Sequence, residues 1–346
     1  MAALPEPNHS TVAKIVEWYA AQAATKTPRE YLGASSLGHE CQRYPALAFR
    51  LARTKPKDGR VARLLQTGHR EELRLLADLR AIGVKVWDRD EAGQQWSVSF
   101  LGGHGRGHLD AVALGLPEAP KTPHVIDCKT TKAEKFRAVV KHGIRKTFPV
   151  YFAQGVLYMG LMDLERAAFL FVNKDDDSLH LERFEFDRTE FDRLMALAER
   201  IVFGAALPPK AGEKAEDIPC EWCDFKDVCW GEQTVPATCR SCAHVTPERD
   251  GTWQCGRHTR ALSFAEQRAG CRDHRFVPIY LEHVAEPVDS DGDAVTYRHR
   301  ASGRTFVNGS RPGYLSAEIH ACADRSMLGD AFVEELRETC DGTVVG

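Results

Sequence analysis

The chain has 346 residues, a formal net charge of −3 and a hydrophobic share of 43%. No apolar run is long enough to span a bilayer and no secretory leader is evident, so we expect a cytoplasmic protein rather than a membrane or secreted one. Disulfides are not expected in that setting, and the 11 cysteines are therefore expected to be metal ligands or ordinary thiols.

Hydrophobic periodicity, taken in chain order, predicts an α/β fold with a central mixed sheet flanked by helices. Helices are expected near residues 11–24, 44–53 and 62–82, around Gln154, and over 189–203. Strands are expected near residues 84–88, 95–100, 107–114, 124–130, 166–173 and 179–186. After residue 271, strands are expected over 277–284 and 295–307, and helical stretches over 317–336.

Two neighbouring strands of this prediction carry carboxylates, Asp110 in the first and Asp127 in the second. Because side chains alternate along a strand, Asp127 and Lys129 share one face and Cys128 points away. A hairpin would bring Asp110 beside them. Two converging carboxylates can hold Mg²⁺ or Mn²⁺, and Lys129 could orient or activate a water and offset phosphate charge. Alone, the pattern also fits an exposed ion pair at a strand end.

Two polar pairs at helical spacing accompany the carboxylates. His69 and Glu72 are three positions apart and share a helix face, although we expect Glu72 to be solvated. Gln154 and Tyr158 are four positions apart in an apolar helix, where buried polar groups need partners.

In this order the residues resemble the PD-(D/E)XK nuclease superfamily, and within it the RecB-like branch. The resemblance covers roughly residues 31–230 and implies a restriction-endonuclease-like core. The implied metal ligands are His69, Asp110, Asp127 and the main-chain carbonyl of Cys128. The implied catalytic residues are Asp110, Asp127, Lys129, Gln154 and Tyr158, of which the last two contact DNA or support the site.

A cysteine cluster follows the predicted nuclease residues. Cys220, Cys223 and Cys229 lie within ten residues, which leaves a metal centre one thiolate short of four. We expect Cys41 to be the fourth ligand. This arrangement of one distant and three clustered cysteines resembles the iron–sulfur RecB-like nucleases, which include the AddB subunit and CRISPR-associated exonucleases. The resemblance implies a [4Fe–4S] cluster that joins the two ends of the nuclease domain, with zinc as the alternative.

A second cysteine group has spacing close to that of a zinc ribbon. It consists of Cys239, Cys242, Cys255 and Cys271. We expect a tetrahedral Zn²⁺ site, in which His258 or His274 could replace one thiolate. The module could grip DNA or a partner, or could only stabilise a small fold.

Basic residues are concentrated beside the predicted site. Residues 42–80 contain ten Lys or Arg against four acids, and residues 129–146 contain seven against one. Such blocks could neutralise a phosphate backbone, although solvated helix faces look the same. The expected DNA contacts are Ser36, Arg43 and Lys132.

We therefore expect a Mg²⁺- or Mn²⁺-dependent deoxyribonuclease that degrades DNA from its ends in recombination, repair or bacteriophage DNA processing. By analogy its origin is a phage or prophage, which would place it in the host cytoplasm. The expected domains are 1–232 (nuclease), 233–280 (zinc knuckle) and 281–346 (a small α/β appendage). The alternatives are a CRISPR-type accessory nuclease with partner proteins and a non-catalytic nucleic-acid-binding protein.

Overall fold

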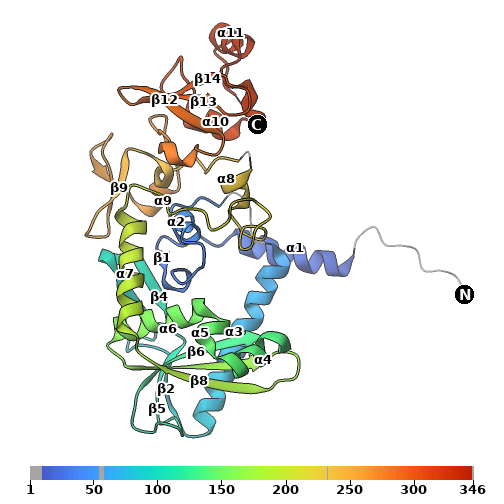
Figure 1. The fold of residues 1–346 in the computed structure, drawn as a ribbon, viewed down its shortest axis with the longest axis vertical. Coiled ribbons are helices and arrows are strands. Elements are labelled where there is room, and N and C mark those ends of the chain that lie inside the picture. Colours follow the sequence, from blue (N-terminus) through green and yellow to red (C-terminus); the bar gives the residue numbers. More distant parts are fainter. Residues whose placement is uncertain (1–9, 54–57, 232, 345–346) are drawn as a thin grey trace, which may run out of the picture. The chain divides into compact units, whose positions relative to one another are not determined.

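The computed structural model describes residues 10–53, 58–231 and 233–344 (Figure 1). It divides into two compact units, each assembled from separated stretches of chain. The first unit comprises Met1–Arg29, Lys55–Ser99 and Arg106–Leu194, and the second comprises Glu30–Thr54, Phe100–Gly105 and Met195–Gly346. The three domains expected from the sequence stay a prediction, and Glu232 at their first boundary lies outside the described residues.

The first unit is built on a five-stranded sheet of order β2-β5-β6-β7-β8. Its strands are β2 (Lys85–Trp87), β5 (Ala111–Leu114), β6 (His124–Thr131), β7 (Arg166–Asn173) and β8 (Leu179–Glu185). Its helices are α1 (Thr11–Ala24), α3 (Gly59–Ala81), α4 (Ala133–His142), α5 (Ile144–Thr147) and α6 (Pro149–Met162). Only the β6–β7 pair is parallel, because α4, α5 and α6 form the crossover between these strands. The mixed sheet confirms the predicted fold class.

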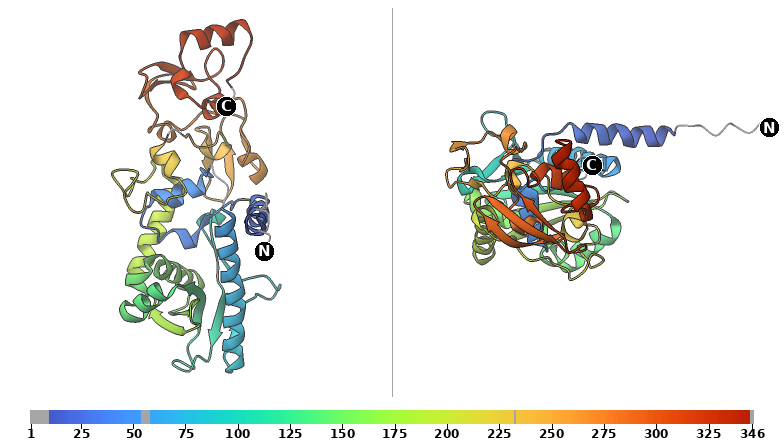
Figure 2. Two further views of the ribbon diagram at one scale, coloured as in Figure 1. Left: turned by 90° about the vertical axis from the view of Figure 1, so that its right-hand side faces the viewer. Right: turned by 90° about the horizontal axis from the view of Figure 1, so that it is seen from above.

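Helices cover both faces of this sheet (Figures 1 and 2). On one face, Leu75, Leu76 and Leu79 of α3 join a buried cluster with sheet residues that include Ile126. On the other face, α6 lies so close that a Cβ at Gly155 would come within 2.5 Å of the Phe184 ring. Glycine therefore allows α6 to approach the sheet, which positions the polar residues of this helix.

The strand expected over residues 107–114 is interrupted. The structure has β4 (Gly105–His108) and β5, with Leu109 and Asp110 between them, after β3 (Ser97–Phe100). The Asp110 side chain explains the interruption, because its Oδ2 accepts the main-chain N–H of Cys128 at 2.7 Å. A carboxylate thus takes the place of a strand carbonyl at this point of the ladder.

Two other expectations need correction. The strand expected over 277–284 is wrong: Pro278–Tyr280 form a 3-10 turn that begins at a proline, which lacks the N–H that a ladder requires. The strand expected over 295–307 is two strands joined by a turn with Gly303 at φ 71°. The helix α4 and the strand Ala285–Asp291 were not expected.

The second unit contains short elements around one buried core. Its helices are α2 (Arg43–Phe49), α8 (Lys226–Trp230), α9 (Phe264–Gln267), α10 (Ser316–Ala321) and α11 (Ala331–Thr339). Its strands are β1 (Leu32–Gly33), β9 (Val245–Pro247), β10 (Trp253–Cys255), β11 (Arg260–Ala261), β12 (Ala285–Asp291), β13 (Ala294–His299) and β14 (Thr305–Asn308). The core includes Leu47, Phe225, Phe276, Tyr297 and Tyr314, so distant parts of the sequence share it.

Helix α7 (Arg188–Phe203) belongs to both units, which divide after Leu194. Within the described residues, no helix has the length and apolar character needed to cross a membrane.

Candidate active site and metal centres

Two carboxylates meet at the start of the β5–β6 hairpin in the first unit. The antiparallel register pairs Ala111 with Ile126, which brings the preceding Asp110 to the level of Asp127. Asp110 is fixed by the main-chain N–H of Cys128, and Asp127 is only 1% exposed. The hairpin therefore provides two adjacent oxygen donors, the ligand type that Mg²⁺ and Mn²⁺ prefer.

Lys129 lies on the same face of β6 as Asp127 and forms an ion pair with it. The Lys129 Nζ is 4.7 Å from the centre of the Tyr151 ring and 5.8 Å from that of Phe169. Burial lowers the pKa of Lys129, but Asp127 and Asp110 outweigh burial and hold this pKa above its ordinary value. The side chain is therefore a fixed cation at neutral pH.

The site carries more negative than positive charge. The charged groups that act on Asp110 include the carboxyl groups of Asp127 and Glu72 and the ammonium of Lys129, so three acidic groups meet one basic group here. Burial and the neighbouring Asp127 raise the pKa of Asp110 well above its ordinary value. Burial also raises the pKa of Asp127, although Lys129 opposes this change. A divalent cation would match the excess charge, so these residues fit such an ion.

Gln154 and Tyr158 support the strand that leads to Asp110. The Gln154 Nε2 donates to the Tyr158 hydroxyl at 3.0 Å, and that hydroxyl donates to the His108 carbonyl at 2.8 Å. Both side chains are buried, at 6% and 2% exposure. Burial, followed by the charge of Asp127, raises the pKa of Tyr158 to about 12, so the hydroxyl stays a donor. The geometry favours the supporting role over direct contact with DNA.

His69 and Glu72 lie on α3 at the edge of the site. The His69 Nδ1 is 3.5 Å from Glu72 Oε2, while the His69 side chain is 78% exposed. The Glu72 side chain is only 21% exposed and its charge acts on Asp110 and Cys128. Sequence reasoning missed Glu72 as a member of the acidic group, although its helical spacing to His69 was the available signal.

Cys128 is a partly buried thiol on the face of β6 opposite to Asp127 and Lys129. Burial and the neighbouring Asp110 raise its pKa well above the ordinary value, so the thiol stays protonated. Its side chain packs on the α3 side of the sheet. The main chain of Cys128, which touches Asp110, is therefore the part of the residue available to the site.

The predicted basic surface follows β6 directly. Exposed Lys and Arg side chains lie on α4 and α5, namely Lys135, Arg137, Lys141, Arg145 and Lys146. Lys132 precedes α4, is exposed and pairs with Glu134 at 2.9 Å. Lys55 and Lys57 of the other basic block lie outside the described residues.

The four cysteines expected to hold a cluster come together in the second unit. Cys41, Cys220, Cys223 and Cys229 line one pocket. The Cys223 Sγ accepts the N–H of Phe225 at 3.4 Å, and hydrogen bonds of this kind stabilise thiolate ligands. Burial, opposed by the charge of Arg43, raises the pKa of Cys229 to about 11. The four cysteines therefore share one pocket, and a metal centre on them stays a prediction.

Ser36 and Arg43 have internal partners in this unit. The Ser36 hydroxyl donates to the Gly33 carbonyl at 2.7 Å. The buried Arg43 guanidinium donates to the Pro208 carbonyl at 2.7 Å and pairs with Glu282 at 2.9 Å. Their contact with DNA stays a prediction, and contact through Arg43 would require these bonds to break.

The second cysteine group also lines a single pocket. Cys239, Cys242, Cys255 and Cys271 surround a cavity of about 150 Å³ together with His244, His258 and His274. The His258 Nε2 lies 3.8 Å from the Cys271 Sγ and 3.3 Å from an Asp273 oxygen, and these three residues form a compact ligand group. Burial lowers the pKa of His274 to about 4, and its Nε2 is already 2.9 Å from the Thr238 carbonyl.

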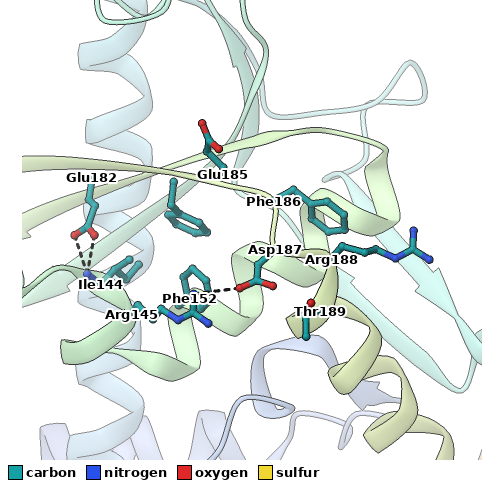
Figure 3. A pocket seen from close by; sticks show the side chains of 10 residues that line it. Ile144, Arg145, Phe152, Glu182, Glu185, Phe186, Asp187, Arg188 and Thr189 are labelled. Carbon is teal, nitrogen blue, oxygen red and sulfur yellow. Dashed lines mark hydrogen bonds and ion pairs between the residues drawn. The ribbon is translucent and has the colours of Figure 1, made fainter.

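The first unit contains a pocket that is larger than the one lined by the second cysteine group (Figure 3). In it, both carboxylate oxygens of Glu182 accept the Ile144 N–H, at 2.7 and 2.9 Å. Arg145 pairs with Asp187 at 3.1 Å. These charged groups fix the turn between α4 and α5, and the lining contains none of the predicted catalytic residues.

Comparisons with known proteins give one family match and several similar solved structures. A family model, described as the PD-(D/E)XK nuclease superfamily, matches residues 9–230. The solved protein SSO0001 is 14% identical with a TM-score of 0.36, and the match covers 64% of this chain and 96% of that one. The alkaline exonuclease LHK-Exo from Laribacter hongkongensis is 16% identical with a TM-score of 0.37, covering 54% and 89%. A phage related exonuclease from Haemophilus somnus 129PT is 15% identical with a TM-score of 0.29, covering 39% and 68%.

No curated protein sequence matches the chain. The family match nevertheless spans more than half of the 346 residues and includes the acidic pair with Lys129. The chain therefore belongs to the PD-(D/E)XK nuclease superfamily.

Proposed function

We propose that the protein is a Mg²⁺- or Mn²⁺-dependent DNA exonuclease that hydrolyses phosphodiester bonds from DNA ends. The observation that carries this proposal is the acidic pair, Asp110 and Asp127, which lies beside the carboxylate of Glu72 and the cation of Lys129. PD-(D/E)XK nucleases use divalent metals, and this site has the oxygen donors and the charge for one.

The residues that would hold the metal are Asp110, Asp127, the main-chain carbonyl of Cys128 and His69. We add Glu72, because it lies beside His69 and its charge acts on Asp110. When bound, the metal polarises a phosphate oxygen and makes a bound water more acidic. Asp110 is held in place by the N–H of Cys128, so the pair needs little rearrangement to bind.

Lys129 acts as a positive charge rather than as a base. The neighbouring carboxylates raise its pKa, so it stays protonated when it meets the substrate. Its ammonium can therefore stabilise the negative charge that develops on the phosphate and orient the attacking water. Tyr158 and Gln154 are positioning residues, because they hold the chain before Asp110 through the His108 carbonyl.

DNA is the proposed substrate, as single strands or duplex ends, in recombination, repair or phage DNA processing. The exposed basic side chains of α4 and α5 support a polyanionic substrate, because they follow the strand that carries Asp127 and Lys129. Lys132 is the member of this group nearest in sequence to the site.

A structural [4Fe–4S] cluster on Cys41, Cys220, Cys223 and Cys229 completes the proposal. The shared pocket of the four cysteines supports it. We also propose Zn²⁺ in the pocket of the second cysteine group.

To test the proposal, the full chain is purified anaerobically. Its absorbance is then measured at about 400 nm, where iron–sulfur thiolates absorb. Iron and zinc are quantified in the same sample. Activity is measured on 5′-labelled linear single-stranded DNA, on a covalently closed circle of the same sequence, and on the matching RNA, with Mg²⁺ or Mn²⁺.

We expect degradation of linear DNA only, and loss of this activity in Asp110→Ala and Lys129→Ala with unchanged iron content. Cleavage of the circle at the same rate would overturn the exonuclease assignment. Activity that survives both substitutions would overturn the site, and an inactive protein that still binds DNA would be a non-catalytic binding protein.

A further inference from the structure

Arg240 is a buried residue of the second unit that takes no part in the proposed chemistry. It lies between two predicted zinc ligands, Cys239 and Cys242, in the short turn that also contains Ser241. The residue is only 1% exposed. Burial, followed by the charge of Arg50, lowers the pKa of Arg240 to about 9. An arginine in such surroundings requires strong compensating contacts.

These contacts come from three separate segments. The Nε donates to Gln267 Oε1 at 2.8 Å, within the cysteine-rich region. One Nη donates to the Phe49 carbonyl at 2.9 Å and the other to the Glu30 carbonyl at 2.6 Å. All three acceptors are uncharged, so the contacts rely on the planar fork of the guanidinium, which lysine cannot reproduce.

Glu30 and Phe49 enclose the segment that carries Cys41. Phe49 is the last residue of α2, and the helix begins where the Tyr44 N–H donates to the Cys41 carbonyl at 3.1 Å. The N–H of Cys41 donates in turn to His39 Nδ1 at 3.0 Å. By binding both ends of this segment, Arg240 limits the positions that Cys41 can adopt.

A second contact joins the same two regions. Trp253 lies on β10, two positions before Cys255, and its ring centre is 5.3 Å from that of Phe49. The guanidinium carbon of Arg240 lies 3.9 Å from the centre of the Trp253 ring. The pocket lined by Cys239, Cys242, Cys255 and Cys271 thus lies next to the residues that hold α2.

We propose that zinc bound by Cys239, Cys242, Cys255 and Cys271 fixes Arg240 and Trp253 against residues 30–49, and so holds Cys41 in place for the iron–sulfur centre. Small zinc modules derive much of their folding free energy from the metal, because their apolar cores are small. Zinc is therefore a structural ligand here, and its loss releases the distant cysteine of the other centre. This inference rests on the two metal sites of the proposed function.

The experiment uses the full chain and four variants, each purified anaerobically and analysed for zinc and iron. Cys255→Ser removes a zinc ligand. Arg240→Gln keeps the zinc ligands but removes the guanidinium group and its three hydrogen bonds. The matched controls are Arg268→Gln, an exposed arginine of the same region, and Cys340→Ser, an exposed cysteine outside both groups. The readouts are the rate of iron release to a chelator and, in samples freed of iron, the rate of Cys41 alkylation followed by mass spectrometry.

We expect Arg240→Gln to retain zinc while iron release and Cys41 alkylation become about tenfold faster, the change that corresponds to about 1.4 kcal/mol of lost hydrogen bonding. Cys255→Ser should lose zinc and show at least the same acceleration, and both controls should behave as the unmodified chain. If Cys255→Ser does not fold, iron release and Cys41 alkylation in Arg240→Gln alone test the inference.

The zinc site, the iron–sulfur centre and the link through Arg240 are tested by different outcomes. A chain that purifies without zinc would overturn the zinc site. A chain with zinc but without iron would overturn the iron–sulfur part of the proposed function, while Cys41 alkylation would still measure the effect of Arg240. Unchanged iron release and unchanged alkylation in Arg240→Gln would overturn the link between the two cysteine groups.

Discussion

The acidic pair and the cysteine pocket that contains Cys41 are assembled over very different sequence distances. Asp110 and Cys128 are 18 positions apart and meet within one hairpin. The cysteine pocket depends on contacts such as that of Tyr44 with Asp224, at 3.3 Å and 180 positions apart. A hairpin fixes its geometry locally, whereas the pocket needs the packing of the whole second unit. We therefore expect that a substitution in the acidic pair abolishes cleavage without loss of iron, and that a substitution in the cysteine pocket lowers the stability of the second unit without changing the acidic pair.

The largest expected effect comes from breaking the acidic pair. Asp127→Asn removes a charge from the metal site and should lower kcat on linear DNA by about a thousandfold, since metal stabilisation of the transition state is worth several kcal/mol. Iron and zinc contents should not change. Single-turnover cleavage under saturating Mg²⁺ measures the effect, with Asp175→Asn as an exposed control. Normal kcat in Asp127→Asn would remove this residue from the site.

The next effect comes from the cysteine pocket. Cys223→Ser should lose most of its iron and lower the free energy of unfolding of the second unit by about 3 kcal/mol, because a structural metal contributes to folding directly. Thermal unfolding and iron content measure both changes, with Cys340→Ser as the control. Because the acidic pair lies in the first unit, Mg²⁺ should still raise the unfolding temperature of that unit. Full iron in Cys223→Ser would contradict the ligand assignment.

A smaller effect should follow from removing one hydroxyl. Tyr158→Phe deletes the hydrogen bond to the His108 carbonyl and leaves Gln154 without its acceptor. We expect kcat to fall about tenfold while KM for DNA changes little, since lost buried hydrogen bonds cost about 1–2 kcal/mol. Tyr19→Phe, which removes the hydroxyl bond to Gln66 Oε1 at 2.7 Å outside the site, is the matched control. A change confined to KM would instead favour direct contact with DNA.

The smallest effect is a pH dependence. The pKa of Asp110 is raised in the folded state, so folding takes up a proton, and the free energy of unfolding falls as pH rises from the ordinary Asp range through the folded pKa. Without added Mg²⁺, Asp110→Asn should keep only the smaller decline that comes from Asp127 and be about 1 kcal/mol more stable at neutral pH, because the amide oxygen can still accept the Cys128 N–H. Urea unfolding between about pH 5 and pH 8 measures the difference. If the unmodified chain and Asp110→Asn showed the same pH dependence, the raised pKa of Asp110 would be refuted.

In the unmodified chain, added Mg²⁺ should oppose this fall in the free energy of unfolding. Protons compete with the metal for Asp110 and Asp127, so the stabilisation by Mg²⁺ should grow as pH rises and be absent in Asp110→Asn.

The sequence by itself determined the local chemistry. The alternation along β6 placed Asp127 and Lys129 on one face, and the ion pair between them confirms that geometry. The helix expected near residues 11–24 is also confirmed, since α1 spans Thr11–Ala24 and the Ser10 hydroxyl accepts the Ala13 N–H at its start. Periodicity and capping act over a few residues, so they can be read from the sequence alone.

Tertiary structure decided what depends on distant neighbours. Residue types indicated that Asp110 belongs to the site, but only the hairpin showed that its carboxylate interrupts the strand by accepting the Cys128 N–H. The inward position of Glu72 and the burial of Arg43 and Arg240 likewise follow from the surfaces packed against them. Helical spacing gives the face on which a side chain lies, but burial and charge depend on what covers that face, which sequence separation does not encode.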